Sequence, residues 1–112
     1  MSLYDLLIRN GSLVTSQGVE HADLAISAGR VVARDAELTG SAEQEIDARD
    51  LHIFPGVIDA HVHFNEPGRT EWEGFASGTR ALAAGGTTSF AEMPLNASPP
   101  TLDAASFALK KQ

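Results

Sequence analysis

Two histidines separated by one residue, His61 and His63, have the spacing in this sequence that points most directly to chemistry. In a β-strand, residues i and i+2 point to the same side, so the two imidazoles would converge, and Asp59 would lie on the same face. Burying two imidazoles and a carboxylate in one strand is costly unless they are partnered, and neutral imidazole is the commonest metal ligand. The pattern therefore favours a metal site, with two hydrogen-bonded core histidines as the alternative.

Two polar loops are expected to follow neighbouring strands and supply candidate substrate contacts. Asn65 begins the loop 65–70, which also contains Arg69, and Asn96 lies in the loop 93–100. A side-chain amide can orient a polar substrate, but asparagine is also an ordinary turn residue, so both interpretations stay open. His21 and His52 stand at no ligand spacing and are interpreted as structural or surface residues.

The elements that would position these residues alternate between strand and helix after residue 55, which is typical of βα units and a parallel sheet. The nearly apolar run 57–64 predicts a strand covered on both faces, and 87–93 predicts a second strand. Thr70 and Glu73 form a potential capping box for a helix that ends at Gly85 and contributes Trp72 and Phe75 to packing against the sheet. From 101 onward the pattern predicts another helix. If 57–64 is the first strand of a barrel, His63 lies at its C-terminal end, where barrel active sites are built.

The first 54 residues have a shorter, β-like pattern that predicts part of a β-sandwich. Asn10-Gly11 predicts a hairpin turn between 4–9 and 13–14, and Ala28-Gly29 predicts another between 22–26 and 30–34. The segment 35–44 is expected to be a loop, with short strands at 45–47 and 51–54. The predicted domains are therefore 1–54 and 55–112.

Composition excludes several classes of function. The chain has 112 residues with 8 Lys and Arg against 15 Asp and Glu, a net charge of −7 that argues against a nucleic-acid partner. No apolar stretch approaches the roughly 20 residues of a membrane span. With no cysteine, a metal must be held by histidine or carboxylate. The N-terminal residues lack the features of a secretory signal, so a cytoplasmic location is expected.

The run from Phe54 to Phe75, FPGVIDAHVHFNEPGRTEWEGF, resembles the amidohydrolase superfamily and within it the cyclic amidases, above all the allantoinases. The segments AAGGTT at 83–88 and EMPLN at 92–96 extend the resemblance. Dihydroorotases usually carry an arginine two residues after the second histidine, where it holds the substrate carboxylate. Here that position is Asn65, as in allantoinases, whose substrate has no such carboxylate.

The resemblance implies an α/β fold, the start of a (β/α)8 TIM-type barrel preceded by part of a small β-sandwich domain. It implies that His61 and His63 bind one of two divalent metal ions, expected to be zinc, and that Asn96 lies near the substrate loop. The bridging carboxylated lysine, two further histidine ligands and the catalytic aspartate would lie beyond position 112, because Lys110 and Lys111 come too early. The chain is therefore expected to be an N-terminal piece of a hydrolase, with no catalytic residue of its own.

The expected activity of the complete enzyme is opening of a small cyclic amide, allantoin to allantoate, by a homo-oligomer, expected to be a tetramer. Metal ions in such a site lower the pKa of bound water and polarise the amide carbonyl. Three alternatives remain: a dihydroorotase or hydantoinase with the same fold, a non-catalytic scaffold, and an inactive piece.

Overall fold

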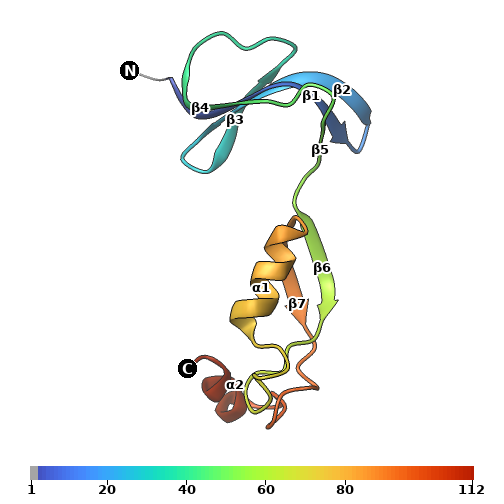
Figure 1. Cartoon of the computed structure of the whole chain (residues 1–112), viewed down its shortest axis with the longest axis vertical. Helices are drawn as coiled ribbons and strands as arrows, with labels where there is room; N and C mark the ends of the chain where they lie inside the picture. Colours follow the sequence, from blue (N-terminus) through green and yellow to red (C-terminus); the bar gives the residue numbers. More distant parts are fainter. Residues whose placement is uncertain (1–2) are drawn as a thin grey trace. The chain divides into compact units, whose positions relative to one another are not determined.

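The computed structural model describes residues 3–112 and divides into two compact units, Met1–Pro55 and Gly56–Gln112 (Figure 1). Each unit has its own sheet. Within residues 3–112, no helix has the length and apolar character needed to cross a membrane.

The first unit is a five-stranded sheet in which the longest strand is central. β1 (Tyr4–Thr15) pairs antiparallel with β2 (Gly18–Ser27), which pairs with β3 (Arg30–Asp35). On the other edge of β1, β4 (Ala42–Asp47) and then β5 (His52–Ile53) run parallel to it. β1 therefore pairs with three strands, β2, β4 and β5, and the short β5 is the last strand of the unit.

The predicted hairpin turn at Asn10-Gly11 is wrong, because β1 continues through it as a bulge. The pairing with β2 shifts between Ile8 and Gly11, and Asn10 has a φ of 62°. Ile8 and Leu13 are five residues apart and would face opposite sides of a regular strand. Because the bulge adds a residue, Ile8 instead packs against the buried core cluster that Leu13 forms with Ala22 and Leu24. The positive φ of Asn10 thus belongs to the bulge that shifts the β1–β2 pairing, and the chain reverses at residues 16–17 instead.

The second predicted hairpin is confirmed, with β2 and β3 joined at Ala28 and Gly29, whose φ angles are 50° and 71°. The loop predicted at 35–44 is shorter than expected, since β4 begins at Ala42.

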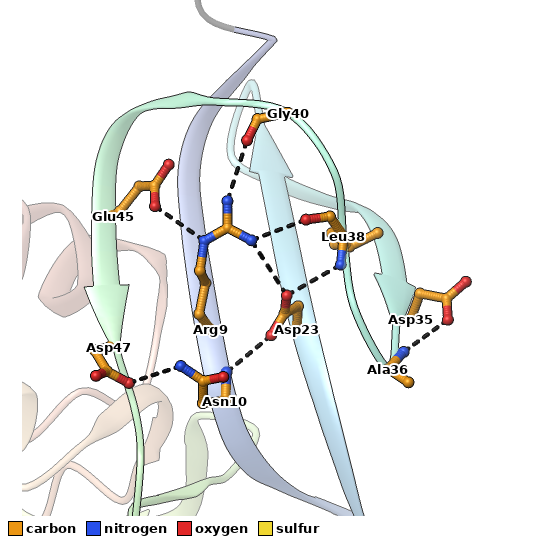
Figure 2. Close-up of polar contacts among 9 residues, drawn as sticks. All are labelled: Arg9, Asn10, Asp23, Asp35, Ala36, Leu38, Gly40, Glu45 and Asp47. Atoms are coloured by element: carbon orange, nitrogen blue, oxygen red, sulfur yellow. Dashed lines mark hydrogen bonds and ion pairs between the residues drawn. The ribbon is translucent and has the colours of Figure 1, made fainter.

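A polar network fixes that loop and β4 to β1 (Figure 2). The carboxylate of Asp23, only 4% exposed, accepts hydrogen bonds from the backbone N–H groups of Asn10 and Leu38 at 2.8 and 3.1 Å. The Arg9 guanidinium lies 3.4 Å from Asp23 and donates to the carbonyl of Gly40 and to Glu45. Burial raises the pKa of Asp23, but the two N–H groups and the guanidinium together lower it by more than burial raises it. The pKa of Asp23 therefore lies below its ordinary value.

The second unit contains two parallel strands and two helices. β6 (Val57–Val62) is followed by α1 (Phe75–Ala84), β7 (Thr87–Glu92) and α2 (Ala104–Lys110). This strand–helix–strand–helix order is the one predicted from sequence. Asp103 caps α2 and forms a capping box with Ser106.

The capping box predicted at Thr70 and Glu73 is absent, and α1 begins at Phe75 with Gly74 as its N-cap. The carbonyl of Glu73 accepts a hydrogen bond from Asn65, which holds this segment in the loop. The first helical N–H, on Phe75, is instead satisfied by the Glu66 carboxylate at 2.7 Å. Trp72 therefore precedes the helix and is 69% exposed, which corrects its predicted packing role.

The prediction that β6 is covered on both faces is also wrong for this chain. Ile58 is 74% exposed, whereas Phe64, which follows the strand, is 3% exposed. The ring of Phe64 contacts Phe75 and Phe90, with ring centroids 4.7 and 5.3 Å apart. Burial is thus concentrated at the C-terminal end of β6, next to the candidate site.

Candidate metal site

His61 and His63 point their Nε2 atoms at each other at the C-terminal end of β6. The two atoms are 3.0 Å apart, and the rings meet edge to face. His61 lies in β6 and His63 directly after its last residue, Val62, so the i, i+2 spacing places both rings on one side, as predicted. Both residues are exposed, which excludes the alternative of two buried core histidines in this chain.

The His63 ring is held by the neighbouring strand. Its Nδ1 lies 2.7 Å from the backbone carbonyl of Met93, which comes directly after β7. Only a protonated Nδ1 can donate to a carbonyl, so this contact makes Nε2 of the neutral ring an acceptor, and its lone pair faces Nε2 of His61. Metal-binding histidines are commonly oriented by such a bond from their other ring nitrogen.

The geometry fits a shared metal ion. Two imidazole nitrogens bound to one zinc ion at ~2.0–2.1 Å in a tetrahedral arrangement lie ~3.3 Å apart, close to the observed separation. Among residues 3–112, no group of three or more His, Cys, Asp or Glu side chains could hold a metal ion. The predicted partner on this face, Asp59, accepts a hydrogen bond from the backbone N–H of His61 at 3.1 Å. The described residues therefore bring together two candidate ligands, and a complete metal site needs more.

The loops that contain Asn65 and Asn96 follow β6 and β7 and are joined to each other. Ser98 donates its N–H to the carbonyl of Pro67 at 2.7 Å, and a Cβ on Gly68 would overlap the carbonyl of Ser98. Asn65 is half-buried, and its carbonyl accepts a hydrogen bond from the N–H of Arg69. Asn96 is exposed. Both residues thus lie on one pair of connected loops beyond the C-terminal ends of the strands.

Helix α1 supports the residue that follows His63. Gly78 is the buried residue of this helix, and a Cβ there would overlap the ring of Phe64. Because Phe64 follows His63 directly, this close packing restrains the backbone of the candidate ligand.

The ion pair of Lys110 and Glu92 was not predicted from the sequence. Nζ of Lys110 lies 3.0 Å from Oε2 of Glu92, and the two side chains are only 7% and 10% exposed. Lys110 also donates to the carbonyl of Glu66 at 2.8 Å, and Glu92 accepts the N–H of Phe64 at 3.1 Å. The signal available in the sequence was a glutamate within the predicted strand 87–93, since a buried carboxylate requires a partner.

The remaining candidates are surface residues. The guanidinium of Arg69 lies over the ring of Trp72 at 5.2 Å. His21 and His52 are exposed and distant in sequence from any ligand pair, as predicted.

Sequence relatives point to one group of enzymes. The chain is 62% identical over 110 residues to an allantoinase of Rubrobacter xylanophilus, covering 98% of this chain and 24% of that protein. It is 58% identical over 102 residues to an allantoinase of Deinococcus radiodurans, covering 91% of this chain and 22% of that protein. The chain therefore spans about a quarter of the length of the curated relatives it matches.

Solved structures give the same architecture. An L-hydantoinase (dihydropyrimidinase) from Arthrobacter aurescens superimposes with a TM-score of 0.81 at 33% identity, covering 97% of this chain and 24% of that one. A D-hydantoinase from Bacillus sp. AR9 superimposes with a TM-score of 0.75 at 36% identity, covering 93% of this chain and 23% of that one. These similarities confirm the predicted fold class, the beginning of an α/β barrel enzyme preceded by a β-sheet unit. Residues 52–112, which contain both histidines, match the amidohydrolase family, and the chain belongs to that family.

Proposed function

We propose that this chain forms the N-terminal part of an allantoinase, which hydrolyses the ring amide of allantoin to allantoate. The observation that carries the proposal is the identity of 54–62% to allantoinases along nearly the whole chain. The paired Nε2 atoms of His61 and His63 support it, because hydrolysis of an unactivated ring amide is the kind of reaction that a bound metal ion assists.

In this proposal, His61 and His63 are neutral and hold one of two divalent ions, zinc in the first instance. The Met93 carbonyl keeps His63 in the tautomer that a metal requires. When bound, the metal ions acidify a water molecule and polarise the ring carbonyl. A carboxylated lysine, further histidines and the catalytic aspartate would come from outside these residues, as would the contacts of a tetramer.

Asn65 and Asn96 are proposed to contact the ring. Their side-chain amides can donate to a substrate carbonyl and accept from a ring N–H, which suits a neutral cyclic ureide. Neither amide supplies the charge-assisted pair that would hold a carboxylate. This argues for allantoin over dihydroorotate.

A hydantoinase is the second candidate, because the similar solved structures are hydantoinases. Hydrolysis of allantoin, hydantoin and dihydroorotate by the complete polypeptide that contains this chain would separate the candidates. We expect the specificity constant kcat/KM to be highest for allantoin and lowest for dihydroorotate. Equal values for allantoin and dihydroorotate would contradict the assignment, and a higher value for hydantoin would favour the second candidate.

The metal site is tested by His61→Ala and His63→Ala in the same polypeptide, with His21→Ala in β2 as the matched control. Either site variant should lose at least one metal equivalent and roughly 10³-fold or more in kcat/KM, since metal ions contribute several kcal/mol. The His21 variant should keep both. Full metal content and turnover in both site variants would refute the metal site.

A further inference from the structure

The three residues centred on His63 are all attached to the end of β7. The carbonyl of Val62 accepts the N–H of Met93 at 2.9 Å, and the N–H of Phe64 donates to the Glu92 carboxylate at 3.1 Å. Between them, Nδ1 of His63 contacts the Met93 carbonyl at 2.7 Å. Glu92, the last residue of β7, and Met93, which follows it, therefore fix the backbone on both sides of the histidine as well as its ring.

The Glu92 carboxylate can do this only if its charge is compensated. It is nearly buried, and an uncompensated carboxylate in such a place is strongly unfavourable. Lys110, from the last turn of α2, supplies the compensation at 3.0–3.1 Å.

Lys110 also reaches the loop that follows β6. Its Nζ donates to the carbonyl of Glu66 at 2.8 Å and lies 5.1 Å from the centre of the Phe75 ring. The carboxylate of Glu66 in turn accepts the first N–H of α1. One ammonium group thus connects α2, the end of β7 and the loop that follows β6.

We propose that the buried Lys110–Glu92 ion pair is a positioning device for His63, which holds the backbone around it so that Nε2 is aimed for metal binding. Glu92 acts on the imidazole through the Phe64 N–H and through Met93, which follows it in the chain, and Lys110 acts through Glu92. This inference rests on the proposed metal site and adds two positioning residues to it.

The test measures zinc affinity, by competition with a chromophoric chelator, in the complete polypeptide after removal and readdition of metal. Lys110→Met keeps the aliphatic stem and removes the charge. Loss of an outer partner of a metal ligand typically costs ~10–100-fold in metal affinity, and we expect a loss in this range. The control is Arg34→Met, which removes a positive charge from the exposed ion pair with Glu20 and should leave zinc affinity unchanged.

A conservative pair separates positioning from general stability. The double substitution Glu92→Gln with Lys110→Met leaves an uncharged acceptor for the Phe64 N–H, so zinc affinity should recover toward that of the unsubstituted protein. Glu92→Leu removes the acceptor and should weaken zinc binding even when combined with Lys110→Met. If the Glu92→Leu protein does not fold, the comparison of Lys110→Met with the Gln–Met double variant still decides.

Two outcomes remain distinguishable. Unchanged zinc affinity in Lys110→Met, together with a large loss in His63→Ala, would overturn the positioning role and leave the metal site intact. Unchanged affinity in His63→Ala would overturn the metal site itself.

Discussion

The two units of this chain obtain their order in different ways. The first buries a cluster of aliphatic side chains in a sheet whose central strands are paired on both edges, with Leu7 and Ala25 fully buried. In the described residues of the second unit, the buried hydrophobic side chains are those of Phe64 and Ala97, and Leu102 is 81% exposed. The second unit has fewer buried apolar side chains, and its nearly buried Lys110–Glu92 ion pair connects α2 to β7. The difference shows that the candidate metal site lies in the unit whose own core is the smaller.

The largest stability effect should come from the polar network of the first unit. Asp23→Ala leaves two backbone N–H groups without their acceptor and removes one of the partners of the Arg9 guanidinium, which should lower the free energy of unfolding by about 3 kcal/mol. The exposed pair of Glu20 and Arg34 is the matched control, and Glu20→Ala should cost at most about 1 kcal/mol. Urea unfolding of both variants measures the difference. An equal decrease in the free energy of unfolding would show that the network stabilises the unit no more than an exposed ion pair does.

Hydrogen exchange tests the comparison directly. In the 112-residue chain, amides of β1 and β2 should be protected by a few kcal/mol more than those of β6 and β7, because each strand of a two-stranded sheet has a free edge. Mass spectrometry of exchanged peptides resolves the two units. Equal, strong protection in 57–92 would mean that the second unit builds a sufficient core by itself.

Close packing beside His63 predicts a smaller effect. Gly78→Ala should cost about 1–3 kcal/mol despite the better helix propensity of alanine, since the new Cβ overlaps the Phe64 ring. Gly85→Ala is the control, because a Cβ there meets only carbonyl oxygens at 3.5 and 3.6 Å. Thermal unfolding of the complete polypeptide compares the two, and equal midpoints would contradict the packing argument.

The smallest effect is a pH dependence in the first unit. The folded-state pKa of Asp23 is lowered, so its stabilisation is complete above the unfolded-state pKa and is lost as pH falls through the folded-state pKa. The pKa of Asp47 is also lowered, chiefly by the side-chain hydrogen bond from Asn10. Stability should therefore decline below about pH 4, and less so in Asp23→Ala. An identical acid profile in that variant would exclude Asp23 as a cause.

Local sequence signals succeeded where one short-range rule decided the structure. The φ > 0 preference at Ala28-Gly29 produced the predicted hairpin, and the strand period placed His61 and His63 on one side. The same reasoning failed at Asn10-Gly11, where the positive φ belongs to a bulge in the pairing with β2. It also failed at Thr70, because the Glu66 carboxylate accepts the first N–H of α1, on Phe75.

By itself, the sequence determined the element types, the paired histidines and the family resemblance, because all three depend on residues close together in the chain. Only the tertiary structure decided how His63 is held. The Met93 carbonyl, the Glu92 carboxylate and the Lys110 ammonium come from 29 to 47 positions further along the chain. No periodicity or turn rule connects residues so far apart; parallel pairing of β6 with β7 and the position of α2 bring them together.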